Sequence, residues 1–282
     1  MSPIYRMPVG FGPSLGPRQG PDGKKFNGDE SRCTSVAVTF RTDRDRMAAI
    51  LPDGFEPAED PRVRVQTNFN TDFGWLAGRG YNFAEVVLSA VYHGEEETVA
   101  GDFVAVMWES MADPIISGRE ELGLPKLFAD IPDLRQEDGA TRMTASWEGF
   151  EFLDLKLDGL DLPPWPSDLE AGAEVVNLSL GGADSPVPRL YYKYLPRTAN
   201  LEEADAAYVT MTPPGNYGMK VLETWNGEGS VNFNRARWED LPTFAQVVNG
   251  LAELEIKEYV GASMSRVIIQ FDDLTGVQRV LK

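Results

Sequence analysis

Short runs in which apolar and polar residues alternate recur along most of the 282-residue chain, and they constrain its fold more than any other feature. A period of two is that of a half-buried β-strand. Turn-forming residues such as Gly, Asn and Pro separate the runs. They lie at residues 34–41, 63–68, 85–92, 103–108, 141–147, 150–157, 174–180, 189–194, 208–211, 220–225, 230–233 and 262–271. Because the connections in the second half are of hairpin length, we expect antiparallel pairing.

Two segments have helical spacing instead. Thr42 is a candidate N-cap, and an acidic first turn and an apolar stripe follow it before Pro52 stops the helix. Residues 241–254 place apolar side chains on one face of a longer helix. Many strands with two or three helices predict a single α+β domain, built on a curved antiparallel sheet or cone-like barrel with a few peripheral helices.

The N-terminus differs from the rest of the chain. Residues 1–27 are rich in Pro and Gly, which predicts an arm that lies over a surface, packs on a partner subunit or is disordered, ahead of the main domain at 28–282. The arm lacks the apolar core of a signal peptide, and no apolar run is long enough to span a membrane. Cys33 is the single cysteine, so no intramolecular disulfide can form. We therefore expect a cytoplasmic protein.

The formal net charge of −18 limits the partners of the protein. Nucleic acids and anionic membranes are bound by clustered Lys and Arg, so we expect neither as a partner. An anionic substrate would need a locally positive site.

Most catalytic chemistries lack the residues that they need. The sole histidine, His93, lies in a polar turn typical of the surface, so a histidine triad or a zinc site is not expected. Cys33 has no obvious base and is expected to be a small buried residue rather than a nucleophile. No strand precedes a glycine-rich nucleotide-binding motif. We expect neither a metal nor an organic cofactor.

Lys126 is the most informative residue. Its neighbours are apolar: Leu122, Leu124, Pro125, Leu127 and Phe128. Such surroundings favour the free amine over the ammonium, and a free amine attacks a carbonyl carbon to form an imine. The protonated imine withdraws electrons from the adjacent carbon, so carbon dioxide or a proton can leave. The alternative is a lysine whose stem packs while its amine reaches water.

The stretch from Gly118 to Lys126, Gly-Arg-Glu followed five residues later by Pro-Lys, resembles the lysine motif of the acetoacetate decarboxylase family. Weaker similarity covers about residues 28–275, at Phe40-Arg41-Thr42-Asp43, Leu51-Pro52, Lys193 with Pro196, Trp225-Asn226-Gly227 and Leu241-Pro242. The resemblance implies that Lys126 forms a Schiff base with a small keto acid. It also implies a homo-oligomer, a tetramer or larger.

The resemblance assigns roles to two further residues. Arg32 matches the carboxylate-binding arginine if a one-residue shift near Cys33 is allowed; the alternative is an ordinary surface arginine. Glu85 matches a pocket glutamate and is a candidate acid or base; the alternative is a carboxylate at a strand edge. Independently of the family, the hydroxyl of Tyr259 is a candidate for a dehydration step, unless this residue is a packed aromatic.

Two positions depart from the family pattern. Leu127 stands where a second lysine is expected, which removes a neighbouring cation and leaves desolvation to activate Lys126. Gln66, a candidate substrate-binding residue, replaces a glutamate. Both changes are compatible with superfamily members that condense pyruvate with an aldehyde and dehydrate the adduct. We therefore expect a Schiff-base lyase, with aldolase-dehydratase chemistry ahead of decarboxylation. The remaining alternative is a non-catalytic binding protein with the same fold.

Overall fold

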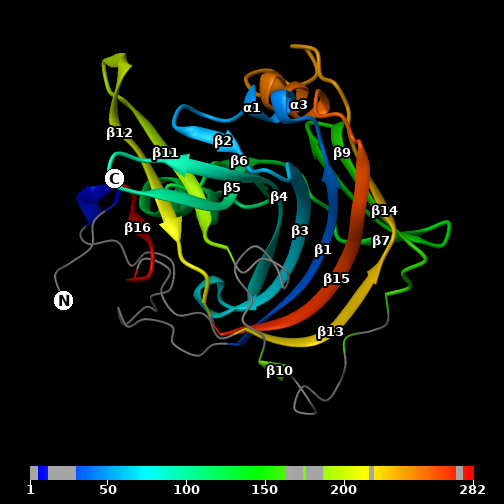
Figure 1. Ribbon diagram of the computed structural model, residues 1–282. Coiled ribbons are helices and arrows are strands. Elements are labelled where there is room, and N and C mark those ends of the chain that lie inside the picture. Colours follow the sequence, from blue (N-terminus) through cyan, green and yellow to red (C-terminus); the bar gives the residue numbers. More distant parts are fainter. Residues whose placement is uncertain are drawn as a thin grey trace.

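The computed structural model describes residues 6–11, 30–162, 165, 174–175, 187–215, 219–270 and 276–282, which form two sheets and a few helices (Figure 1). The larger sheet has 12 strands. Its main path runs β10 (Glu174–Val175), β13 (Met219–Gly227), β15 (Glu258–Gln270), β1 (Glu30–Arg41), β3 (Arg62–Phe73), β4 (Arg79–His93), β5 (Thr98–Glu109), β11 (Arg189–Arg197), β12 (Asn200–Thr212) and β16 (Arg279–Val280). Two short strands lie off this path: β2 (Phe55–Pro57) pairs with β4, and β6 (Lys126–Phe128) pairs with β5.

The smaller sheet has the order β14 (Gly229–Phe233), β9 (Phe150–Asp158), β8 (Ala140–Trp147) and β7 (Arg135–Glu137). Side chains from both sheets share one large hydrophobic core. The long strands β1, β3 and β15 sweep through a wide arc, which confirms the expected curvature (Figure 1). A closed barrel is not seen among the described strands, because the path ends at β10 and β16, which have two residues each and form no closing seam.

Most strand pairs are antiparallel, as expected, but β5 is different. Its second edge pairs in parallel with β11 at Asp102 and Phe103, and with β6 from Met107 to Glu109. Two distant segments are thereby brought to the same edge of one strand.

The register gives the sheet two chemically distinct faces. Paired residues share a face, and successive residues alternate between faces. One row runs Val38–Val65–Val86–Val106 across β1, β3, β4 and β5, and we call its side the core face. The adjacent row runs Ala37–Gln66–Glu85–Met107–Lys126 and continues onto β6; we call its side the Lys126 face.

Three α-helices are described. In α1 (Arg44–Ala48) the N-cap is Asp43 and not Thr42, because the Asp43 carboxylate accepts the backbone N–H groups of Asp45 and Arg46. The helix expected at 241–254 is α3 (Ala245–Ala252). A helix that the sequence did not predict, α2 (Ala112–Ser117), continues directly into the π-helix η3 (Gly118–Leu122). Two short 3-10 helices are η1 (Val9–Phe11) and η2 (Gly74–Leu76).

Several expectations fall outside the described residues. Only 6–11 of the proposed arm at 1–27 are described, and the boundary at 27/28 is not. The strand expected at 174–180 is described only as β10, and the last residue of the run at 262–271 is not described. Among the described residues, no helix combines the length and apolar character needed to cross a bilayer.

Candidate active site

Lys126 is the first residue of β6, and its side chain is buried. The Nζ atom lies 2.7 Å from Glu109 Oε1 and donates a hydrogen bond to the carbonyl oxygen of Pro114 at 3.0 Å. The side chain is only 7% exposed. The apolar flanking residues therefore describe its setting incompletely, because a buried carboxylate faces the amine.

The turn from α2 to β6 holds the lysine in place. Within it, the Leu124 N–H donates to Gly118 O at 3.0 Å, and Arg119 Nη1 donates to Lys126 O at 2.9 Å. A Cβ atom at Gly118 would lie 2.5–2.7 Å from the Cδ, Cε and Nζ atoms of Lys126. Glycine thus allows the lysine side chain to lie directly against the helix backbone. Short π-helical turns of this kind are frequent at functional sites.

Glu109 ends β5 and shares a face with Met107, two residues before it. Glu109 is almost completely buried, with 1% of its side chain exposed. Burial raises the pKa of its carboxyl group; Lys126 opposes this rise, and the charge of Glu85 adds to it. Within the part of the chain that the structure describes, no hydrogen bond reaches Glu109 Oε2. The carboxyl is therefore suited to gaining and releasing a proton next to the amine.

A second buried ion pair lies on the same face. Arg189, the first residue of β11, binds Glu85 through two hydrogen bonds: Nη1 to Oε1 at 3.1 Å and Nη2 to Oε2 at 2.6 Å. The exposed fractions of the two side chains are 4% and 1%. Because both oxygens of Glu85 are engaged, its carboxyl group is held in place by the guanidinium.

Gln66 lies directly opposite Glu85 across the β3–β4 pair. Its Nε2 donates to Asn68 Oδ1 at 3.2 Å, and the Cys33 thiol donates to the same oxygen at 3.5 Å. Burial raises the pKa of the Cys33 thiol to about 12, so the thiolate is disfavoured. The expectation that Cys33 is a small buried residue is confirmed.

Arg32 and Tyr259 are not brought to the Lys126 face. Arg32 has the strand parity of Val38 and leaves β1 on the core face, where its Nε lies 3.7 Å from Asp72 Oδ2. The one-residue shift that aligned Arg32 with a family arginine is, in a strand, a change of face. Tyr259 pairs with the core residue Phe40, with ring centroids 6.4 Å apart, and its hydroxyl accepts a hydrogen bond from the Val231 N–H at 3.4 Å.

The structure also adds residues that the sequence did not single out: Glu109, Asn68 and Arg189. Glu109 lies one residue beyond the alternating run at 103–108, and its parity with Met107 is the signal that could have found it. Arg189 is 104 residues from Glu85, and no local pattern links them.

The structure also places His93 and Leu127 and bears on the possibility of a metal site. His93 is exposed and pairs with Glu56 at 2.9 Å, as expected of a surface residue. Leu127 packs against the hydrophobic core, on the opposite face from Lys126. Across the described ranges, no group of three or more His, Cys, Asp or Glu residues is arranged to hold a metal ion.

Solved structures define the class of fold. An acetoacetate decarboxylase structure has a TM-score of 0.63 and 16% identity, and covers 91% of this chain and 90% of its own. The acetoacetate decarboxylase of Legionella pneumophila has a TM-score of 0.62 and 18% identity, with 93% and 92% covered. The enduracididine biosynthesis enzyme MppR has a TM-score of 0.61 and 15% identity, with 99% and 97% covered. The fold is therefore acetoacetate decarboxylase-like.

The chain belongs to the acetoacetate decarboxylase family, because the sequence profile of that family matches residues 6–281. It is 29% identical over 129 residues to the acetoacetate decarboxylase of Clostridium botulinum, covering 43% of this chain and 50% of the relative. Over 135 residues it is 29% identical to the Burkholderia vietnamiensis enzyme, covering 44% and 50%. The chain thus matches about half the length of these curated relatives, and its low identities mark a divergent member.

Proposed function

We propose that this protein is a Schiff-base-forming lyase that condenses pyruvate, or a similar small keto acid, with an aldehyde and then dehydrates the adduct. The observation that carries the proposal is the buried contact between Lys126 Nζ and Glu109 Oε1 at 2.7 Å. It provides a nucleophile together with a proton carrier in one water-poor location.

The pair supplies the free amine that imine formation needs. Burial raises the pKa of Glu109, so its carboxyl holds a proton more readily than an exposed glutamate does. Transfer of a proton from Nζ to Glu109 gives a neutral amine and a neutral acid, and removes two charges from the interior. The amine nitrogen then attacks the keto carbon, and the protonated carboxyl can return its proton to the departing hydroxyl.

The covalent sequence balances without a further reactant. Loss of water from the first adduct gives the iminium ion, and loss of a proton from the neighbouring methyl group gives the enamine. The enamine carbon attacks the aldehyde carbon, and the aldehyde oxygen takes up a proton. Loss of a second proton and of that hydroxyl as water forms the carbon–carbon double bond. Hydrolysis of the imine releases the unsaturated keto acid and regenerates Lys126.

We propose separate roles for the two buried carboxylates. Glu85 was the candidate acid or base, but both of its oxygens hold Arg189, so we assign proton transfer at the amine to Glu109 and positioning of Arg189 to Glu85. Arg189 and the iminium ion provide local positive charge for the substrate carboxylate on the Lys126 face. Arg32 stays a proposed carboxylate ligand only if substrate reaches the other face, and the same holds for the hydroxyl of Tyr259.

A specific observation favours condensation over loss of carbon dioxide. Gln66 lies opposite Glu85 where the family pattern has a glutamate, so the row carries one fewer negative charge. The fold relative MppR was solved with pyruvate and with the condensation product of pyruvate and imidazole 4-carboxaldehyde, which supports the same reaction class.

The second candidate function is decarboxylation of acetoacetate or a related 3-oxo acid, which the curated relatives support by their names. In that reaction the bond to the carboxylate breaks, its electron pair moves into the iminium ion, and carbon dioxide leaves. A third possibility, a non-catalytic binding protein, predicts an unreactive Lys126. We also propose a homo-oligomer of four or more subunits, which light scattering of the purified protein would test.

Borohydride reduction tests the proposed function. The protein is incubated with pyruvate and borohydride, and its intact mass and tryptic peptides are measured. A reduced adduct on Lys126, absent from Lys126→Ala, is expected, and an unchanged mass would support the non-catalytic alternative. Product analysis then separates the two reactions: an unsaturated keto acid from pyruvate plus an aldehyde supports condensation, whereas carbon dioxide from acetoacetate with no condensation product overturns it.

A further inference from the structure

Two buried amide atoms beside the catalytic pair have no hydrogen-bond partner among the described residues: Gln66 Oε1 and Asn68 Nδ2. The two residues are 4% and 6% exposed. They bond to each other through their other atoms, Gln66 Nε2 and Asn68 Oδ1. Since buried polar groups in native proteins are nearly always paired, an acceptor and a donor left unpaired side by side need an explanation.

The sheet places these amides within reach of a molecule bound to Lys126. Across β3, β4 and β5, the row Asn68–Phe83–Glu109 lies next to the row Gln66–Glu85–Met107. All these side chains share the Lys126 face. Strands are about 4.8 Å apart, so the backbone of Asn68 is roughly 10 Å from that of Glu109. This span suits the length of a small aldehyde whose carbonyl carbon meets an enamine on Lys126.

We propose that Gln66 and Asn68 form a subsite for the far end of the aldehyde substrate, and that this end carries a neutral group able both to donate and to accept a hydrogen bond, such as a hydroxyl. The inference rests on the proposed function and specifies its second substrate. A hydroxyl satisfies both open atoms, as donor to Gln66 Oε1 and as acceptor from Asn68 Nδ2. A carboxylate would face the oxygen of Gln66 and the charge of Glu85.

The choice of ligand does not depend on how the two amides are oriented. If both amides were turned over, they would still bond to each other through one donor and one acceptor, and would again leave one donor and one acceptor open. The complementary ligand group would be the same.

Asn70 provides a matched control for a structural amide. It lies two residues beyond Asn68 on the same strand and face, it is 4% exposed, and its Nδ2 donates to the carbonyl oxygen of Tyr81 at 3.2 Å. Asn70→Leu should lower the melting temperature, because it removes this buried side-chain hydrogen bond. The double variant Gln66→Met/Asn68→Leu also removes the weak thiol hydrogen bond from Cys33 to Asn68. It should still leave the melting temperature equal or higher, because it removes two unpaired polar atoms at similar side-chain volume.

The specificity test compares 3-hydroxybenzaldehyde with benzaldehyde, each with pyruvate. We expect kcat/KM to favour the hydroxylated aldehyde about tenfold in the wild type and in Asn70→Leu, and to show no preference in the double variant. A ratio near one in the wild type, or a preference that survives in the double variant, would overturn the proposal. A marked loss of melting temperature in the double variant would instead assign the amides a structural role.

Failure of the subsite can be told apart from failure of the proposed function. If the wild type gains no borohydride adduct with pyruvate, the Schiff-base function is wrong. The subsite is then tested by calorimetry with the unreactive pair 3-hydroxybenzyl alcohol and benzyl alcohol. Tighter binding of the hydroxylated alcohol to the wild type, lost in the double variant, supports the subsite, and equal binding overturns it.

Discussion

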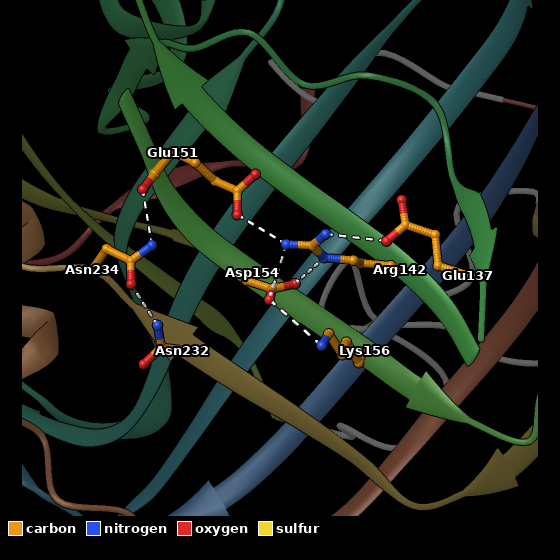
Figure 2. Close-up of polar contacts among 7 residues, drawn as sticks. All are labelled: Glu137, Arg142, Glu151, Asp154, Lys156, Asn232 and Asn234. Atoms are coloured by element: carbon orange, nitrogen blue, oxygen red, sulfur yellow. Dashed lines mark hydrogen bonds and ion pairs between the residues drawn. The ribbon is translucent and has the colours of Figure 1, made fainter. Parts of the chain in front are cut away.

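The molecule carries two clusters of charged residues that differ mainly in their exposure to water. On the smaller sheet, Arg142 contacts Asp154 at 2.7 Å, Glu151 at 3.0 Å and Glu137 at 3.1 Å, with Lys156 3.9 Å from Asp154 (Figure 2). The Arg142 side chain is 27% exposed. On the Lys126 face, the pairs Lys126–Glu109 and Arg189–Glu85 have similar contact distances, but none of the four side chains is more than 7% exposed.

The difference in exposure determines how much each cluster contributes to the stability of the fold. Charges near water are solvated in both the folded and the unfolded chain, so the Arg142 cluster costs little and contributes little. The buried pairs lose their hydration, and an apolar replacement of similar volume would often be as stable. Stability therefore gives no reason for two buried ion pairs on one face, whereas the proposed catalysis through the Lys126 amine would.

The largest effect is expected from Lys126→Met. Removing the amine removes the nucleophile, so both the borohydride adduct and turnover should disappear. Lys156→Met, in the exposed cluster, is the matched control and should keep both. The measurement is intact mass after reduction, together with product formation. Turnover by Lys126→Met at the wild-type rate would contradict the proposal that the buried cluster, unlike the exposed one, supplies the nucleophile.

The next largest effect is expected from Glu109→Gln. Glutamine cannot take the proton from Nζ, so adduct formation with pyruvate should slow about 10²–10⁴-fold. Glu151→Gln, the control from the exposed cluster, should react at the wild-type rate. Quenched borohydride reactions at successive times give these rates. Equal rates for Glu109→Gln and the wild type would show that a group other than Glu109 takes the proton from the amine.

The same variant has a signature in the pH dependence of stability. Because the pKa of Glu109 is raised above its ordinary value of 4.5, the folded protein holds this proton at a pH where the unfolded chain has released it. The contribution of Glu109 to the free energy of unfolding therefore falls as the pH rises from about 4.5 through the raised pKa. The stability difference, wild type minus Glu109→Gln, should decrease over that window in urea titrations. A difference that increases would contradict the raised pKa.

A smaller but still large effect is expected from Arg189→Met on stability. It leaves Glu85 buried without its partner, which should cost about 3–5 kcal/mol in the free energy of unfolding. The double variant Arg189→Met/Glu85→Leu should recover most of this loss, because the buried carboxylate that lost its partner is removed as well. Urea unfolding measures both. If Arg189→Met were as stable as the wild type, the buried Arg189–Glu85 pair would contribute as little to the free energy of unfolding as the exposed cluster does.

The smallest effect is expected from Arg142→Gln. Its partners are partly solvated, so the free energy of unfolding should change by less than about 1 kcal/mol, and added salt should reduce the change further. Urea unfolding at low and high salt measures this. A loss as large as that of Arg189→Met would show that exposure does not separate the two clusters.

Much of the fold, but only part of the site, follows from the sequence. Alternation located the long strands, and motif spacing singled out Lys126. Alternation could place Glu109 on the face of Met107, but it could not show that this face meets Lys126, because that contact depends on the parallel β5–β6 pair. The face on which Arg32 lies could not be predicted from the resemblance, because a shift of one residue, negligible in an alignment, reverses the face of a strand. Helix α2 lacked a recognisable apolar stripe.

The alternation of side chains along β6 also changes what can be inferred from Leu127. Its side chain packs in the core, so a lysine at this position would leave β6 on the face opposite the amine of Lys126. The absence of a second lysine therefore says little about how Lys126 is activated, whereas the substitution at Gln66, which shares its face, says more.

The segment from Gly118 to Lys126, which contains η3 and ends at the first residue of β6, limits how the coding sequence of this protein can change. Gly118 is fixed at one end by its contact with the lysine side chain, and Lys126 at the other by its place on β6, where it pairs with Met107 of β5. Insertion or deletion of one codon between them would bring a neighbouring residue into the position of Lys126 and turn the lysine toward the core. Under the proposed function, a change of one residue in the length of this segment is therefore expected to abolish the reaction at Lys126.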